Sequence, residues 1–120
     1  MTMQIMEMTA LELGRKIKEK EVSVKEAVQA SLDTIEAKDE ALHSFVTVDT
    51  ERALARADEV QKGIEDGTYT GPLAGVPAAV KDNICTENLL TTCSSKILYN
   101  FVPPYSAQAV CNLNAAGGVI

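Results

Sequence analysis

Apolar residues recur at spacings of three and four through the first half of the chain, which is the pattern of amphipathic helices. A first helix is expected after Thr9, with Leu13 and Ile17 on one face, and a second after Ser23. Thr9 and Ser23 are each followed three positions later by a glutamate, which predicts a capping box at both helix starts. The second helix carries a stripe at helical spacing, made of Val24, Val28, Ser31, Leu32 and Ile35.

A third helix is expected from Asp49 to a stop at Gly67. Its inner face is predicted to consist of Ala53, Ala57, Val60 and Ile64. The charged residues of all three helices are interpreted as a solvated face, because unpaired charges are rarely buried. Between the second and third helices, Phe45–Val48 is short and rich in β-branched residues, which favours a short strand or extended segment.

The pattern changes at Gly71, after which the chain is richer in Gly, Pro, Ser, Thr and Cys and poorer in charge. The apolar residues 78–80 predict a buried strand, a helix is expected from Ser106 to Ala116, and Val119-Ile120 is typical of the start of another strand. Strand, helix and strand in this order form a βαβ unit. We therefore expect an α/β fold in which a helical region, 1–70, packs on the beginning of a mixed sheet, 71–120. The sheet is expected to be incomplete, so that the two regions form one partial domain.

Composition narrows the class of protein. The chain has 120 residues, of which 46% are hydrophobic and 23% charged, and this ordinary globular mix argues against disorder along most of its length. The net charge of −6 does not favour a surface that grips nucleic acid phosphates. The longest apolar stretch, 73–80, is far shorter than the ~20 residues of a membrane helix. Without a basic segment preceding an apolar run at the start, a cytoplasmic location is expected.

Lys81 is the strongest candidate for chemistry. It follows an expected strand and precedes a polar turn, and α/β sheets carry functional groups at the carboxyl ends of their strands. A lysine amine among apolar groups gives up its proton more readily, and the neutral amine can then act as a base or nucleophile. The alternative is a surface lysine whose ammonium group reaches water.

Other polar residues are interpreted as structural. His43 stands alone, while Asp82 and Asn83 are typical of residues that hydrogen-bond a turn. Ser94 and Ser95 lack the G-x-S-x-G elbow of a nucleophile and are expected to bond the backbone locally. The three cysteines match no zinc or redox spacing and are interpreted as reduced, small buried groups; they are Cys85, Cys93 and Cys111. No motif predicts a cofactor or a metal ion in this chain.

Four motifs carry a family resemblance: GPLAGVP, VKDNICT, TTCSSKIL and NFVPPY, in that order and spacing within 71–105. With them the chain resembles the amidase signature family, and within it the glutamine-hydrolysing components of bacterial tRNA-dependent amidotransferases. The preceding helices and the ALHSFVTVD segment also fit, so the resemblance covers essentially the whole chain, as an amino-terminal part of the amidase signature fold. Glu87-Asn88 departs from the Lys-Gly usual in the family, although Asn tolerates the left-handed conformation that Gly would supply.

The resemblance implies a glutaminase that uses a Ser–cis-Ser–Lys triad. The family's catalytic lysine falls on Lys81, whereas both triad serines lie in a Gly/Ser-rich segment downstream of these 120 residues. It further implies that ammonia passes to a B subunit, which uses ATP and Mg²⁺ to amidate Glu-tRNA(Gln) or Asp-tRNA(Asn), while a small C subunit wraps the pair. The tRNA is then contacted mainly through the partner.

Two alternatives remain open. The chain could be a binding or structural remnant without catalysis, or an amidase could act on small aliphatic or aryl amides without tRNA. The TTCSSKIL and NFVPPY segments favour the tRNA-linked branch over the small-amide amidases.

Overall fold

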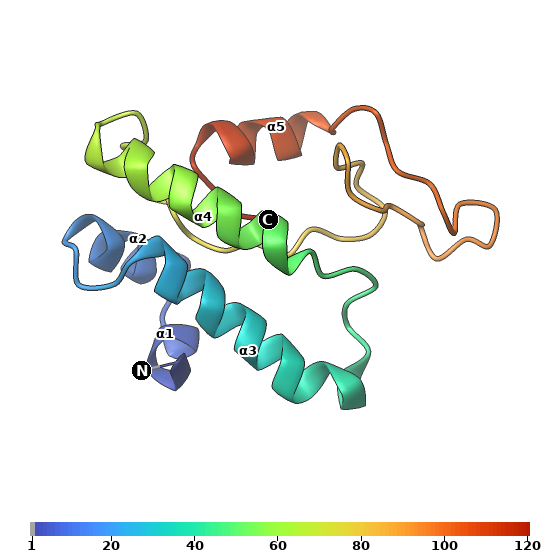
Figure 1. The fold of residues 1–120 in the computed structure, drawn as a ribbon, viewed down its shortest axis with the longest axis horizontal. Helices are drawn as coiled ribbons and strands as arrows, with labels where there is room; N and C mark the ends of the chain where they lie inside the picture. Colours follow the sequence, from blue (N-terminus) through green and yellow to red (C-terminus); the bar gives the residue numbers. More distant parts are fainter. Residues whose placement is uncertain (1) are drawn as a thin grey trace.

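The computed structural model describes residues 2–120, in which five helices form. Their bounds are α1 Thr2–Glu7, α2 Ala10–Lys18, α3 Val24–Leu42, α4 Thr50–Glu65 and α5 Gln108–Ala115. Helices α3 and α4 pack side by side, α1 packs on α3, and α5 lies on the other side of α4 (Figure 1). None of the helices in the described part of the chain is long and apolar enough to cross a membrane.

The helix starts predicted at Thr9, Ser23 and Asp49 are confirmed, although Thr9 forms only half of the predicted capping box. Thr9 is the N-cap of α2, where its Oγ1 accepts a hydrogen bond from the Glu12 amide at 3.2 Å. At α3 the capping box is complete, because the Glu26 amide donates to Ser23 Oγ at 3.1 Å and the Ser23 amide donates to Glu26 Oε2 at 2.8 Å. The Ser23 hydroxyl also donates to Glu26 Oε2, at 2.9 Å, and the bonds from the Ser23 amide and hydroxyl to this carboxylate lower the pKa of Glu26. Asp49 likewise caps α4.

Replacing Ser23 by alanine is expected to lower the free energy of unfolding by about 1 kcal/mol, because the first turn of α3 loses its side-chain acceptor. Urea unfolding followed by circular dichroism measures the change. Ser44→Ala is the matched control, since Ser44 is exposed and lies just beyond the end of α3. Equal midpoints for the two variants would contradict the role given to this cap.

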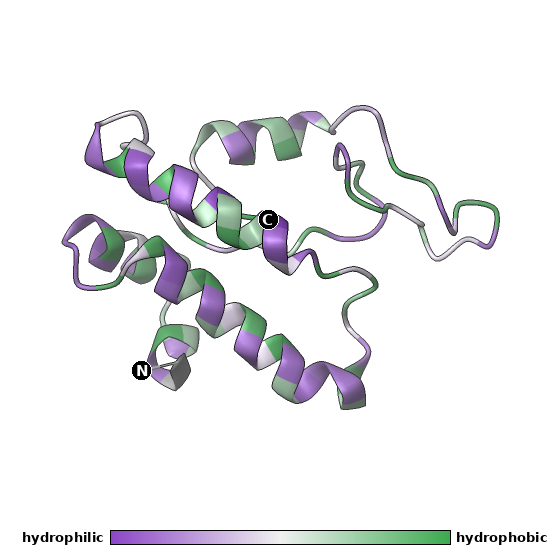
Figure 2. Ribbon diagram, in the orientation of Figure 1, coloured by the Kyte–Doolittle hydropathy of each residue, from purple (hydrophilic) through white to green (hydrophobic). Residues whose placement is uncertain are grey.

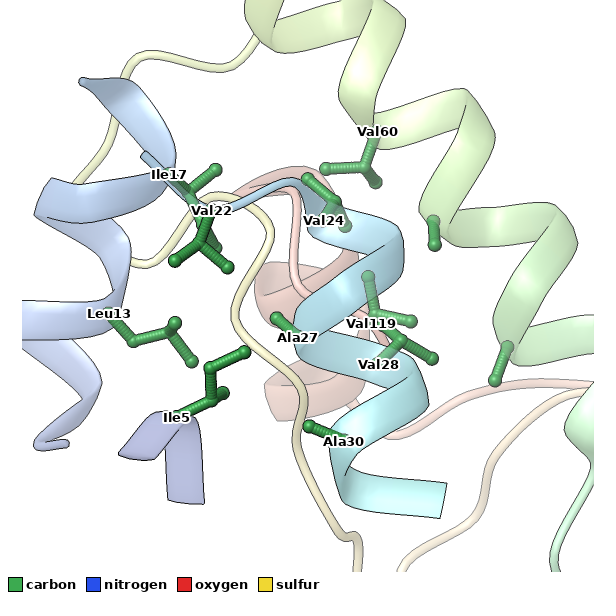
Figure 3. Close-up of a cluster of buried hydrophobic side chains, with 12 residues drawn as sticks. Ile5, Leu13, Ile17, Val22, Val24, Ala27, Val28, Ala30, Val60 and Val119 are labelled. Carbon is green, nitrogen blue, oxygen red and sulfur yellow. The ribbon is translucent and has the colours of Figure 1, made fainter. Parts of the chain in front are cut away.

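The core lies where α1, α2, α3 and α4 meet (Figure 3). Figure 2 shows apolar and polar residues interleaved along α3 and α4, as amphipathic helices require. Val119, from the end of the chain, joins the helical core. Its buried members are Ile5, Leu13, Ile17, Val22, Val24, Ala27, Val28, Ala30, Ala53, Ala57, Val60 and Val119. Helix α1 was not expected from the sequence, because six residues contain too few repeats of an apolar pattern.

The expected mixed sheet is not confirmed. Within residues 2–120 the structure shows a single parallel bridge, between Pro77 and Val119, and no strand at 78–80. The Ala78 amide donates to the Val119 carbonyl at 2.7 Å, and the Val119 amide donates to the Val76 carbonyl at 3.2 Å. Two segments joined by α5 therefore begin the parallel pairing of a βαβ unit. One pair of short segments is too little to make a stable sheet.

Of the two forms predicted for Phe45–Val48, a short strand or an extended segment, the strand is not found. Helix α3 runs on to Leu42, and His43 ends it in a left-handed conformation with φ of 51°. The Phe45 amide then donates to the Asp39 carboxylate at 3.3 Å. Because this donor is used locally and the segment is mostly exposed, it has no neighbouring strand with which to pair.

Two irregular segments, 85–91 and 101–107, are hydrogen-bonded to each other and extend from the helices (Figure 1). The Thr91 amide donates to the Phe101 carbonyl at 2.9 Å, and the Asn88 amide donates to the Pro103 carbonyl at 3.1 Å. At the other end of the pair, the Ala107 amide donates to the Cys85 carbonyl at 2.8 Å. The paired segments thus begin shortly after Lys81 and lead into α5.

Candidate active site

Lys81 lies in the turn that follows the paired segment 76–78, and its side chain is exposed. Its carbonyl accepts a hydrogen bond from the Ile84 amide at 3.0 Å, which closes the turn. Within the residues that the structure describes, Lys81 Nζ has no hydrogen-bond partner. The apolar surroundings that would make its amine a base are therefore not supplied by residues 2–120.

Asp82 connects the Lys81 turn to a segment ten residues further along the chain. Its Oδ1 accepts a hydrogen bond from the Thr92 amide at 2.8 Å, and its Oδ2 accepts one from the Thr92 hydroxyl. The Asp82 main-chain carbonyl accepts a third bond, from the Cys93 amide, at 2.9 Å. We refer to Asp82, Thr92 and Cys93 together as the Asp82–Thr92 clamp.

Two opposing effects act on the Asp82 carboxyl. Partial burial raises its pKa, because removal from water disfavours the charged form. The hydrogen bonds from the Thr92 hydroxyl and amide and from the Ser94 amide stabilise the charged form and outweigh burial, so the pKa lies below its ordinary value. Asp82 thus acts as an acceptor that holds the turn, which confirms the prediction that it hydrogen-bonds a turn.

The clamp holds a strained turn. The Ser95 amide donates to the Thr92 carbonyl at 2.9 Å, and both central residues have positive φ, 52° at Cys93 and 54° at Ser94. Such turns favour Asn-Gly, and a left-handed conformation costs most other residues about 1–2 kcal/mol each. The Ser94 amide also contacts Thr92 Oγ1 at 3.3 Å, so Thr92 organises the turn from within.

The other sequence candidates are not brought together into a catalytic group. Ser94 is exposed, and the Ser95 hydroxyl accepts a local bond from the Ile97 amide at 3.2 Å, as expected for a turn serine. His43 and Asn83 are exposed. No three side chains of the metal-ligating type cluster anywhere in the described residues.

All three cysteines are free thiols, but their predicted burial is wrong for two of them. Cys93 and Cys111 are exposed, and Cys85 is half-buried, with its thiol donating to the Tyr105 hydroxyl at 3.6 Å. Cys93 lies in a turn with a left-handed backbone, and Cys111 lies at an exposed position of α5.

Two residues around the site have backbone roles. Asn88 adopts a φ of 60°, so it takes the left-handed conformation that the family's usual Gly would supply. Thr92 is buried and belongs to the TTCSSKIL motif, but the sequence did not indicate its pairing with Asp82, which lies ten positions away. A pairing over that distance follows neither a helical nor a strand period.

Arg56, which lies in α4, holds α5 against α4. Its Nη2 donates to the Asn114 carbonyl at 2.6 Å, in the last turn of α5. The helix dipole also favours a cation at this carboxyl end. Arg56 Nη1 bonds the Tyr69 hydroxyl at 3.3 Å and pairs with Glu59 at 2.9 Å. An open depression of about 430 Å³ beside it is lined by Arg52, Ala55, Arg56, Glu59, Asn114 and Ile120. Lys81 does not line this depression.

Comparison with known proteins identifies the family to which the chain belongs. A family model described as Amidase matches residues 26–120, and the chain belongs to the amidase family. The A subunit of glutamyl-tRNA(Gln) amidotransferase from Agathobacter rectalis is 60% identical over 118 residues, which are 98% of this chain and 24% of the relative. The protein of the same name from Lachnospira eligens is 52% identical over the same shares. The chain therefore spans about a quarter of the length of the curated relatives it matches.

Solved structures support the same fold. Peptide amidase from Stenotrophomonas maltophilia superposes with a TM-score of 0.87 and 31% identity, over 94% of this chain and 23% of that enzyme. A bacterial aryl acylamidase of the amidase signature family has a TM-score of 0.83 at 23% identity, over 93% of this chain and 24% of that enzyme, which supports the fold alone. The chain folds as the corresponding parts of these enzymes do, although the described residues 2–120 form a single parallel bridge.

Proposed function

We propose that this chain is the amino-terminal part of the glutamine-hydrolysing component of an amidotransferase. The ammonia released would convert Glu-tRNA(Gln) or Asp-tRNA(Asn) to Gln-tRNA(Gln) or Asn-tRNA(Asn). The observation that carries the proposal is 60% identity to the A subunit of a glutamyl-tRNA(Gln) amidotransferase over 98% of this chain. On this proposal 1–70 and 71–120 belong to one partial domain, which is supported by the packing of Val119 into the helical core.

Lys81 is the residue proposed for catalysis in this chain. In the Ser–cis-Ser–Lys mechanism a lysine accepts a proton from the bridging serine, which in turn activates the nucleophilic serine for attack on the amide. The family resemblance implies that both serines lie downstream of these 120 residues, so the chain by itself is expected to be inactive. Because Lys81 is exposed here, the remaining part must also supply the walls that exclude water from its amine.

The proposed partners are the B and C subunits of the amidotransferase. Glutamine is the substrate of the component to which this chain belongs, whereas ATP and Mg²⁺ are expected at the B subunit, which would also contact most of the tRNA. Since aminoacyl-tRNA is used in translation, the proposed location is the cytoplasm.

The test is complementation. The chain is mixed with the carboxyl-terminal part of the Agathobacter rectalis relative and with B and C subunits, and ammonia release is measured with glutamine and with small aliphatic and aryl amides. Release from glutamine supports the proposal. Association without any release favours a binding or structural role, and release from the small amides alone favours an amidase that does not use tRNA.

A further inference from the structure

We propose that Asp82 and Thr92 are positioning residues for Lys81, and that the Asp82–Thr92 clamp fixes the position of the Lys81 Cα. The inference rests on the proposed function of Lys81. It assigns a task to two side chains that the triad itself does not use.

The clamp restrains the backbone directly beside Lys81. Both carboxylate oxygens of Asp82 are engaged by Thr92, while the Asp82 carbonyl is engaged by the Cys93 amide at 2.9 Å. The Lys81 carbonyl is held by the Ile84 amide at 3.0 Å. The peptide unit between Lys81 and Asp82 is therefore tied on both sides, through side-chain and main-chain contacts.

This restraint matters because the side chain of Lys81 has none of its own among the described residues. Its amine is exposed and lacks a hydrogen-bond partner there. A base works only within hydrogen-bond reach of the proton that it accepts, and a displacement of about 1 Å can lower a rate roughly a hundredfold. With four flexible methylene groups, the amine can be aimed reproducibly only if its Cα is fixed.

The strained turn gives a second reason to assign a functional role to the clamp. Cys93 and Ser94 both adopt positive φ without being Gly or Asn, and such backbone persists only where surrounding contacts over-determine it. Thr92 makes those contacts, because its hydroxyl bonds Asp82 and also faces the Ser94 amide. Strain held next to a proposed catalytic residue is consistent with preorganisation rather than with an ordinary loop.

A nearly identical pair elsewhere in the chain provides the control. Asp66 Oδ1 accepts hydrogen bonds from the Thr68 amide at 2.9 Å and from the Thr68 hydroxyl, in an exposed turn that follows α4. Thr68→Val removes the same kind of bond as Thr92→Val, but the acceptor it leaves is Asp66 rather than the residue next to Lys81. Thr92→Ser keeps the hydroxyl and serves as the conservative rescue.

The first measurement is amide hydrogen exchange by NMR on the 120-residue chain. We expect Thr92→Val and Asp82→Asn to speed exchange at the Cys93 amide by roughly tenfold or more, since a local opening needs less free energy. Thr92→Ser and Thr68→Val are expected to leave exchange at Cys93 unchanged. Unchanged exchange in Thr92→Val would overturn the proposal, because the clamp would then not hold this backbone.

The second measurement is kcat and KM for glutamine in the complemented assembly. Thr92→Val and Asp82→Asn should lower kcat by roughly ten- to a hundredfold with little change in KM, and Thr92→Ser should restore it. If Lys81→Ala abolishes activity while Thr92→Val keeps the wild-type kcat, the positioning role is wrong and the proposed function stands. If Lys81→Ala keeps full activity, or the wild-type assembly has none, the proposed function fails and the positioning role with it.

Discussion

Replacing Lys81 by alanine is expected to reduce ammonia release from glutamine by at least about a hundredfold in the complemented assembly. A positioned general base contributes roughly 10²–10⁴-fold to a rate, and alanine leaves the bridging serine without a group to accept its proton. Lys81→Arg should fail as well, because a guanidinium keeps the positive charge but does not lose its proton in proteins. The Lys81→Arg variant thus shows whether the reaction needs a base at this position or only a positive charge.

Lys96→Ala is the matched control for this prediction. Lys96 is exposed, as Lys81 is, and belongs to the TTCSSKIL motif, but it lies outside the Asp82–Thr92 clamp. Its replacement should leave ammonia release within about twofold of the wild type, as for most surface changes. Full activity in Lys81→Arg would contradict a base at this position, and equal losses in Lys81→Ala and Lys96→Ala would point to a general effect of surface charge.

Replacing Gly75 by alanine is expected to lower the free energy of unfolding by roughly 2–5 kcal/mol, from backbone strain and overpacking together. Gly75 is buried and has a φ of +82°, which alanine rarely adopts. A Cβ there would lie 2.7 Å from Val24 Cγ2 and 3.3 Å from two carbons of Ile17, all within the core. The change would also strain the backbone whose amide donates to the Gly117 carbonyl at 2.8 Å.

Thermal and urea unfolding by circular dichroism measure this loss. Gly71→Ala is the control in the same turn region, because a Cβ at Gly71 would meet nothing within 4 Å. We expect Gly71→Ala to remain within about 0.5 kcal/mol of the wild type. If Gly75→Ala melts with the wild-type midpoint, segment 74–76 does not pack on α2 and α3 as described.

The helices from α2 to α5 were predictable because their signals are local. Ser23 and Glu26 lie three positions apart and bond each other directly, and Ala53, Ala57 and Val60 repeat within one helix face. No strand forms at 78–80 or at 45–48, because a strand needs partners from elsewhere in the chain. Residues 78–80 follow Pro77, which forms a single bridge with Val119. The Phe45 amide donates to the Asp39 carboxylate instead of to another strand.

The candidate site was predictable only in part for a similar reason. Lys81 could be singled out because it ends an apolar segment and falls within a recognisable motif. Thr92 lies in the TTCSSKIL motif, but its role could not be predicted, since its pairing with Asp82 depends on how the intervening loop folds back. The sequence allowed two interpretations of Lys81, an amine held among apolar groups or an exposed surface lysine. The choice between them required knowing which residues lie around the side chain.

Ammonia release from glutamine, titrated with this chain against a fixed amount of the carboxyl-terminal part and the B and C subunits, tests the central claim most directly. We predict that release rises with added chain and saturates at one chain per carboxyl-terminal part, because each triad needs one Lys81. No release at any ratio, although the pieces associate, would contradict the account and leave the chain as a binding or structural element.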